Sequence, residues 1–271
     1  MLFLELRIAI LLFACIIATI TDIKKGLIYD KITLPAIGLG IILNVFDFNL
    51  LNFAIPLFVF IFFAILYYLG KIGGGDVKLF AASSLILPFY NNQIFIIPAL
   101  FFSALFSVVF ISVFYTIKYV RTGIDFQKNK KNILQASLLS LALVIYFIFT
   151  ISSNLLPTQS MFFILIPIIF ALPFLAFQQG IRERFFLKYV SVDALEEDEI
   201  IAKEFFESQA IFKTKGIITE KDKIKLKQMN IDKVPVYQGL PPFAPFFLLG
   251  IILALLFPDF LSLLFVAPLY S

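Results

Sequence analysis

The chain reads Gly70-Lys71-Ile72-Gly73-Gly74-Gly75-Asp76-Val77-Lys78 between two long apolar runs. A carboxylate at the edge of a hydrophobic segment is costly to keep near lipid, so Asp76 is a candidate functional residue. The three glycines before it lack a Cβ, which permits unusual backbone conformations and close approach of another segment. A second carboxylate, Asp22, ends the first apolar run. Two carboxylates at the ends of apolar segments predict a functional pair at a membrane boundary.

The composition is that of a membrane protein with several spans. Of the 271 residues, 61% are hydrophobic and 36 are Phe, whereas a soluble domain is about half apolar. The N-terminal residues carry no basic region, and no small-residue cleavage site follows the first apolar run. We therefore expect a retained transmembrane helix there, and not a cleaved signal peptide.

The lack of His and the near lack of Cys restrict the catalytic chemistry that is possible. The sequence contains no His and a single Cys, Cys15. A Ser-His or Cys-His nucleophile pair, an HExxH zinc site and a four-cysteine zinc site are therefore excluded. We expect no metal and no cofactor, and Cys15 is expected to be a small core residue inside its apolar run. Acid–base chemistry must then use Asp, Glu, Lys or Tyr.

The apolar runs predict about eight transmembrane helices, since a spanning helix needs about 20 residues. The runs cover residues 2–20, 32–48, 51–69, 79–90, 94–119, 133–151, 161–177 and 243–266. The run at 79–90 is short by itself. Residues 79–120 together are nevertheless long enough for two spans, with a polar hairpin tip at Asn91-Asn92-Gln93.

The basic residues indicate the orientation. With the N-terminus outside and about eight crossings, every Lys and Arg except Arg7 falls on the cytoplasmic side, as the positive-inside rule requires. If residues 79–90 did not cross, most of these charges would move outside. The formal net charge of +4 thus reflects membrane orientation, and we expect no nucleic-acid partner. The same topology puts Asp22 and Asp76 together on the cytoplasmic face.

A polar stretch at residues 179–242 predicts a small cytoplasmic insert of the α+β type. Its acidic start favours a helix from residue 196 to about 209, a second helix is expected from 219 to about 229, and residues 234–237 are expected to be extended. The Pro-rich segment after Gly239 then returns to the membrane.

The predicted fold class is therefore an all-α polytopic membrane protein that carries this α+β insert. The expected domains are a membrane catalytic core (1–120), further transmembrane helices (121–178), the cytoplasmic insert (179–242) and a C-terminal transmembrane helix (243–271).

Two carboxylates held close together can hydrolyse a peptide bond without metal or covalent intermediate. Like charges a few ångströms apart do not both ionise easily, so the pair shares one proton and titrates as a unit. The ionised partner takes a proton from water, and the protonated partner polarises the scissile carbonyl. Simpler interpretations remain open: Asp22 as an interfacial residue beside Lys24 and Lys25, and Asp76 as a helix N-cap.

Residues 21–28 (Thr-Asp-Ile-Lys-Lys-Gly-Leu-Ile) and 73–79 (Gly-Gly-Gly-Asp-Val-Lys-Leu) resemble the type IV prepilin peptidase family, in its archaeal preflagellin/prepilin branch. The resemblance covers about the first 120 residues well, and the Pro-rich return to the membrane more loosely. It implies a GxGD aspartyl protease of the cell membrane, multi-pass, with its active site facing the cytoplasm. Asp22 and Asp76 would be the catalytic pair, and Gly73, Gly74 and Gly75 would form the loop that supports the catalytic site.

The resemblance also implies the partners. Family members remove short basic leader peptides from the prepilin or preflagellin precursors of type IV pili and archaella, so these precursors and membrane lipid are the expected partners. Two departures are evident. Tyr29-Asp30 follows Ile28 where the family often has Pro-Asn, and the zinc loop of the bacterial branch, with its N-methyltransferase activity, is not expected in a chain with one Cys.

Two other classes remain open. A presenilin-like or signal-peptide-peptidase-like protease is suggested by Tyr29-Asp30, the glycine loop and Pro98-Ala99-Leu100 in that order, although Asp30 lies in a Lys-flanked loop. A transporter could use Asp76 as an ion or proton site, but no inverted repeat is visible.

Residues 196–199 (Glu-Glu-Asp-Glu) could attract basic leaders or could simply begin a solvated helix.

Overall fold

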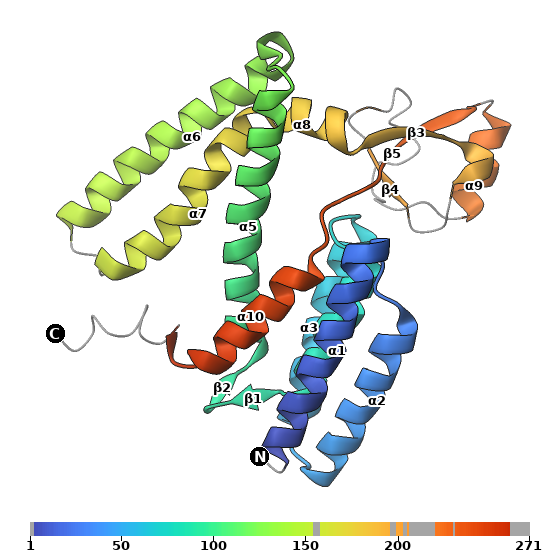
Figure 1. Ribbon diagram of the computed structural model, residues 1–271, viewed down its shortest axis with the longest axis vertical. Coiled ribbons are helices and arrows are strands. Elements are labelled where there is room, and N and C mark those ends of the chain that lie inside the picture. The colour runs from blue at the N-terminus through green and yellow to red at the C-terminus, as the bar shows by residue number, and fades with distance from the viewer. Residues whose placement is uncertain are drawn as a thin grey trace. The chain divides into compact units, whose positions relative to one another are not determined.

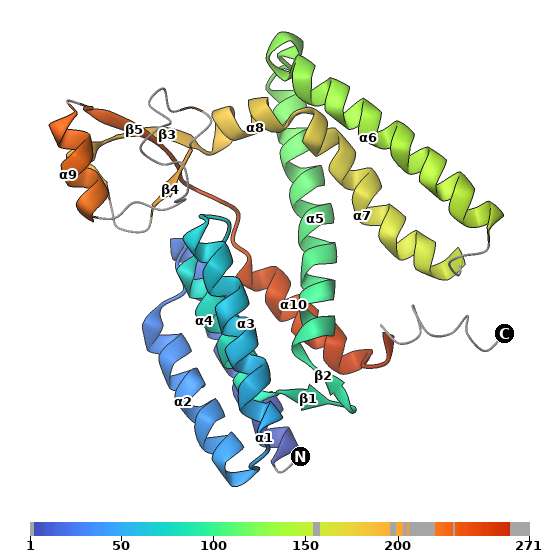
Figure 2. The same cartoon turned by 180° about the vertical axis from the view of Figure 1, so that it is seen from behind.

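Long apolar helices account for most of the structure. The computed structural model describes residues 3–153, 158–195, 199–202, 205, 220–229 and 231–260 (Figures 1 and 2). Within these residues, the helices long and apolar enough to cross a membrane are α1 (Leu4–Lys25), α3 (Leu51–Tyr68), α5 (Ile96–Arg121) and α6 (Phe126–Ser152). They become five if Leu165–Ala176 and Gln178–Phe185, bent by 70°, form one broken span. These are the helices of a polytopic membrane protein.

Three other apolar helices are shorter than a full membrane span. Helix α2 (Asp30–Phe46) has 17 residues, and α4 (Gly74–Ile86) and α10 (Ala244–Leu256) have 13 each. These lengths fall below the roughly 20 residues of an untilted span. The number of eight spans therefore stays a prediction.

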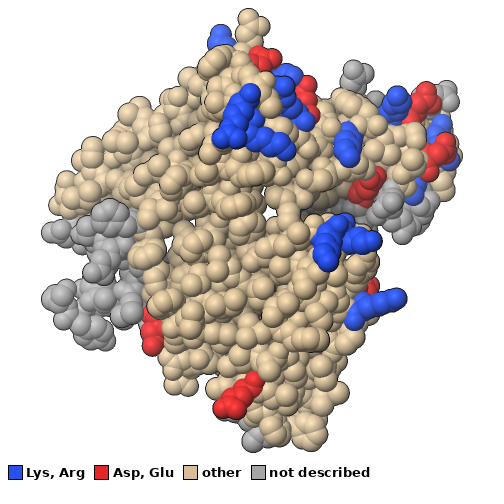
Figure 3. Space-filling view, viewed as in Figure 1, with Lys and Arg blue, Asp and Glu red and all other residues tan. Residues whose placement is uncertain are grey.

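The surface of the helices is suited to lipid. Phe46 and Phe58 are each 70% exposed, and most of the surface visible in Figure 3 carries no charged side chain. Exposed apolar patches of this extent on a protein are typical of membrane contact.

The chain forms two compact units. Unit 1 comprises Met1–Phe89, Ile94–Ile96 and Phe185–Pro245, and unit 2 comprises Tyr90–Gln93, Ile97–Arg184 and Phe246–Ser271. Unit 1 thus joins the first four helices to the polar insert. The four domain ranges expected from the sequence stay predictions.

Helix α4 lies at the centre of the helical part of unit 1. It packs against α1, α2 and α3, and most of its side chains from Val77 to Ile86 are buried. Small side chains permit this close packing, as they do between membrane helices generally. At Gly40 of α2, for example, an added Cβ would lie only 2.8 Å from the Cβ of Leu85.

Arg7, the one basic residue that the topology left on the outer side, is fully buried inside unit 1. Its guanidinium donates to the carbonyl oxygens of Leu43 and Ile86, each at 2.8 Å, and to Asn44 Oδ1, also at 2.8 Å. It also lies 3.9 Å from the Asp47 carboxylate. The last carbonyls of a helix lack partners within the helix, so Arg7 caps the ends of α2 and α4 together.

The polar tip expected between two spans lies in a short β-hairpin that follows α4. Strands β1 (Phe89–Tyr90) and β2 (Gln93–Ile94) form a two-stranded sheet. Asn91 and Asn92 have φ values of 48° and 60°, which is the conformation of the tight turns that connect two-residue hairpins. Asn tolerates this left-handed region better than most residues.

The insert contains a three-stranded antiparallel sheet. Its strands are β3 (Leu187–Ser191), β4 (Ile200–Ile201) and β5 (Lys233–Tyr237), in the order β3-β5-β4. Leu187 is opposite Tyr237, and Ile201 is opposite Val236. A short 3₁₀ turn, η1 (Val192–Ala194), follows β3, and α9 (Glu220–Gln228) packs against it.

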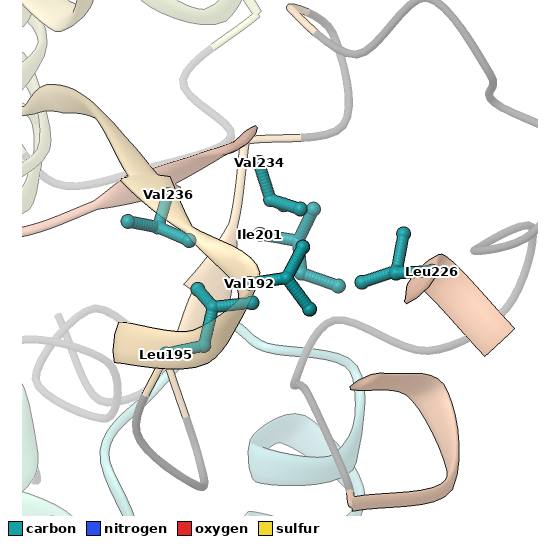
Figure 4. Close-up of a cluster of buried hydrophobic side chains, with 6 residues drawn as sticks. All are labelled: Val192, Leu195, Ile201, Leu226, Val234 and Val236. Atoms are coloured by element: carbon teal, nitrogen blue, oxygen red, sulfur yellow. The ribbon is translucent and has the colours of Figure 1, made fainter. Parts of the chain in front are cut away.

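The insert has its own apolar core, which supports the predicted α+β character. Figure 4 shows the six side chains that form it: Val192, Leu195, Ile201, Leu226, Val234 and Val236. The predicted helix near 219–229 and the extended stretch at 234–237 are confirmed by α9 and β5.

The helix predicted from residue 196 to about 209 is wrong at Ile200 and Ile201, which form β4. Two adjacent β-branched side chains favour an extended backbone, and here Ile201 completes the core beneath β5. Residues 196–198, 203–204 and 206–209 lie outside the described part of the chain.

Unit 2 is a set of packed helices: α5, α6, α7 (Thr158–Ala176), α8 (Gln178–Phe185) and most of α10. Helix α8 is joined to α6 through Gly180, whose N–H donates to Asn129 Oδ1 at 3.0 Å. Helix α10 lies against α5, because a Cβ added at Gly250 would come 2.1 Å from Ser103 Oγ.

Candidate active site

The structure brings the two predicted carboxylates into one pocket of unit 1. Asp22 and Asp76 both line a cavity of about 510 Å³. Its wall is built from the end of α1 and the following loop, from α3 at Tyr67, from the glycine loop and from Glu199 and Ile200 of the insert. Asp22 is close enough to Asp76 for their charges to interact. The sequence-predicted pair therefore exists as a geometric pair.

Asp22 sits in the last turn of α1 and is only 8% exposed. Helix α1 ends at Gly26, which has a φ of 67° and donates its N–H to the Asp22 carbonyl oxygen at 2.8 Å. This left-handed cap is typical of helix ends at glycine. It leads into the loop at residues 26–28, which also lines the pocket.

The Asp22 carboxylate is held by the beginning of α10. Its Oδ2 accepts a hydrogen bond from the Ala244 N–H at 2.9 Å, and Thr19 Oγ1 donates to the Ala244 carbonyl oxygen at 3.1 Å. The first N–H groups of a helix lack partners within it and favour a negative charge. Ala244 thus fixes one carboxylate oxygen of Asp22.

Asp76 lies in the first turn of α4, and Gly73, not Asp76, is the N-cap residue. The Asp76 carboxylate accepts a hydrogen bond from the Gly73 backbone. An acidic side chain three residues after the cap commonly reaches back in this way. Main-chain groups therefore orient both carboxylates, one at the end of α1 and one at the start of α4.

The three glycines act through close packing. A Cβ at Gly75 would lie 2.8 Å from the Ile28 Cβ and 3.0 Å from its carbonyl oxygen, and a Cβ at Gly74 would lie 3.3 Å from the Tyr67 ring. A Cβ at Gly73 would meet Asp76 Oδ2 at 3.1 Å. The positive φ in this loop belongs to Gly70, at 70°. Two reasons for glycine were expected here, an unusual backbone conformation and the close approach of another segment. The second applies to residues 73–75.

The other sequence-predicted acid, Asp30, lies elsewhere. It is the first residue of α2, its side chain is 56% exposed, and it forms an ion pair with Lys78. Pro98, Ala99 and Leu100 lie near the start of α5, in unit 2. Neither Asp30 nor residues 98–100 line the pocket that holds Asp22 and Asp76.

Two further contributors to the pocket escaped a sequence-based prediction. The Ala244 amide was missed because main-chain donors carry no residue signature, although the Pro-rich segment followed by a new helix signals free N–H groups. Glu199 was considered only within the acidic run 196–199, as a group that could attract basic leaders or begin a solvated helix, and not as a pocket residue; it precedes β4 and lines the pocket. Within the described ranges, His, Cys, Asp and Glu side chains form no group of three that could hold a metal ion.

The pocket is thus a carboxylate pair at the ends of two helices of a polytopic membrane protein. Residues 9–117, which include both Asp22 and Asp76, match the type IV leader peptidase family. This match confirms, for that part of the chain, the family resemblance predicted from the two motifs.

Two relatives carry the name prepilin peptidase EppA. The protein of Methanothermobacter thermautotrophicus is 42% identical over 100 residues, which cover 33% of this chain and 25% of the relative. The protein of Methanocaldococcus jannaschii is 35% identical over 83 residues, which cover 31% of this chain and 24% of the relative. The chain therefore spans about a quarter of the length of the curated relatives it matches. No solved structure matches this chain.

Proposed function

We propose that this chain is a membrane-embedded aspartic endopeptidase that removes the short basic leader peptide from prepilin-like or preflagellin-like precursors. The observation that carries the proposal is the convergence of Asp22 and Asp76 on one pocket, within the residues that match a leader peptidase family. The names of the two relatives support the same class of substrate.

In the proposed mechanism, Asp22 and Asp76 share one proton. The ionised carboxylate takes a proton from water as the water oxygen bonds to the scissile carbonyl carbon, and the protonated carboxyl protonates the carbonyl oxygen. Collapse of the tetrahedral intermediate breaks the C–N bond, and the amine leaves with a proton from the pair. Because the reaction needs one proton on the pair, cleavage is expected to fall when both groups are protonated and when both are ionised.

We place the reaction at the cytoplasmic face of the cell membrane, with the N-terminus outside and about eight crossings, since this arrangement obeys the positive-inside rule. The insert then faces the cytoplasm, and the catalytic core, further helices, insert and C-terminal helix keep the ranges 1–120, 121–178, 179–242 and 243–271. Gly73, Gly74 and Gly75 support the site by permitting close packing around Asp76.

The proposal is tested by cleavage of prepilin-like precursors in detergent-solubilised membranes. Wild type is compared with Asp22→Asn, Asp76→Asn and Asp30→Asn, the last being a matched control because Asp30 is an exposed carboxylate paired with Lys78. Loss of cleavage in the first two variants with retention in the third is expected. Loss with Asp30→Asn and retention with Asp22→Asn would support the presenilin-like class.

Failure of wild type to cleave any of several basic-leader precursors would overturn the proposal. Ion flux through reconstituted vesicles that disappears in Asp76→Asn would then support the transporter class.

A further inference from the structure

The pocket has a third acidic side chain, which comes from the polar insert. Glu199 and Ile200 line the same cavity as Asp22 and Asp76, although they lie far from both in the sequence. Glu199 directly precedes β4, which is paired with β5 and anchored through Ile201 in the core of the insert. A residue at the end of an anchored strand has a defined position, and this position is in the pocket wall.

The Glu199 carboxylate is also fixed by a hydrogen bond. Gln238 Nε2 donates to Glu199 Oε1, and Gln238 is itself held to the insert by its N–H, which donates to the Phe186 carbonyl oxygen at 2.9 Å. The chain then runs from Gln238 to Ala244, whose N–H binds Asp22. One short segment therefore contacts both Glu199 and Asp22.

The charges of the pocket favour a cation. Among the described residues, Asp22, Asp76 and Glu199 line it together with one basic residue, Lys78, and Lys78 is paired with Asp30. A carboxylate can accept several hydrogen bonds, so the contact with Gln238 does not exhaust the capacity of Glu199. An acidic wall of this kind attracts a positively charged group and excludes a negatively charged one.

We propose that Glu199 is a specificity-determining residue of this pocket, which binds a Lys or Arg side chain of the leader beside the scissile bond. The inference rests on the proposed function and adds to it the residue that recognises the positive charge of the leader. It also assigns a role to the insert: the insert delivers a recognition residue to a site whose catalytic residues belong to the membrane helices.

A charge-exchange experiment tests the inference. Two precursors are used that differ only in the leader, one with its native Lys and Arg and one with Glu in their place. Cleavage of each is measured with wild type, Glu199→Gln and Glu199→Lys. Asp193→Asn is the matched control, because Asp193 is an insert carboxylate whose side chain is 82% exposed and paired with Lys227.

With the basic leader, Glu199→Gln is expected to lower kcat/KM by about 10-fold, since the negative charge that strengthens the contact with the leader's cation is lost, and Glu199→Lys is expected to lower it further. With the acidic leader, Glu199→Lys is expected to cleave faster than wild type. A structural role for Glu199 would reduce cleavage of both leaders equally, so only charge recognition gives this reversal. Asp193→Asn is expected to match wild type on both leaders.

The outcomes separate this inference from the proposed function. If wild type cleaves the basic leader and Asp22→Asn does not, while the Glu199 variants affect both leaders alike, the inference is overturned and the protease assignment stands. If wild type cleaves neither leader, both are overturned. Thermal unfolding of each purified variant in detergent identifies any loss of cleavage that comes from misfolding. If Glu199→Lys misfolds, the comparison of the two leaders with Glu199→Gln, which keeps the side-chain volume, tests the inference.

Discussion

At the scale of single residues, the Asp22 carboxylate depends on one main-chain donor. Its Oδ2 accepts the Ala244 N–H at 2.9 Å, and Ala244 is the first residue of α10. Proline is well tolerated at the first position of a helix, where its fixed φ suits the helix and its missing N–H breaks no helical hydrogen bond. Replacement of Ala244 by proline therefore removes the donor while leaving the helix intact.

Ala244→Pro is expected to lower the rate of leader cleavage by about 10-fold, because a hydrogen bond to a carboxylate is lost. The measurement is the single-turnover rate with a prepilin-like precursor in detergent. Ala244→Gly, which keeps the N–H, serves as control. Equal activity of the proline and wild-type proteins would show that the amide does not position Asp22 for catalysis.

Gly75 is the glycine of the loop with the tightest surroundings. A Cβ there would lie 2.8 Å from the Ile28 Cβ, so Gly75→Ala should displace the loop after α1 and disturb the approach of Asp76 to Asp22. Cleavage is expected to fall by about 10-fold or more, as for other small misplacements of catalytic groups.

Gly38→Ala is the matched control for Gly75→Ala. A Cβ at Gly38 in α2 has no atom within 4 Å, so alanine should leave cleavage unchanged and could raise helix stability, by about 0.8–1.0 kcal/mol on intrinsic propensity. Thermal unfolding and cleavage assays on both variants distinguish the two positions. Full activity of Gly75→Ala would remove the packing explanation for the glycine loop.

At the scale of helices, the ends are joined by buried polar contacts far from the pocket. Arg7 of α1 binds carbonyls at the ends of α2 and α4. Asn44 adds hydrogen bonds from its Nδ2 to the carbonyl oxygens of Leu85 at 2.8 Å and Asn52 at 3.2 Å. This network fixes the far end of α4, the helix that carries Asp76 at its other end.

Arg7→Met is expected to destabilise the protein by about 3 kcal/mol, because buried carbonyls and the Asp47 carboxylate lose their donor. Unfolding in detergent measures the effect. Arg121→Met is the control, since Arg121 is exposed at the end of α5, and its effect should lie within about 0.5 kcal/mol of zero. Equal stability of Arg7→Met and wild type would contradict a capping role for Arg7.

At the scale of the whole molecule, the proposed topology puts the β1–β2 hairpin outside and the insert inside. The single cysteine, Cys15, is buried in α1, so Cys15→Ala gives a background without reactive thiols. In this background, Asn92→Cys is expected to react with a membrane-impermeant thiol reagent on intact cells. Lys227→Cys, in α9 of the insert, is expected to react only after the membrane is permeabilised.

Labelling of both positions from the same side would contradict the proposed crossings. It would mean that the chain crosses the membrane an even number of times between Asn92 and Lys227, whereas the proposed topology has three crossings there. The apolar helices α5, α6 and α7, which lie between the two positions, are the candidates for such a correction.

Several elements were predictable because their signals are local. Apolar runs predicted the membrane helices, with α3 observed at Leu51–Tyr68 for the run 51–69. A turn was predicted at Asn91 and Asn92, although not the two strands beside it, and β5 and α9 were predicted from their patterns. The helix expected after residue 196 is wrong at Ile200, because pairing with β5 outweighed the local preference for helix that the acidic residues suggested.

A polytopic membrane protein and its two candidate carboxylates follow from the amino-acid sequence alone, because hydropathy, charge and residue type are properties of short segments. The contact between Asp22 and Ala244, the position of Glu199 in the same pocket and the capping of two other helices by Arg7 are known only from the folded chain. These contacts join residues far apart in the chain. They depend on how the helices and the insert pack, which no local pattern encodes.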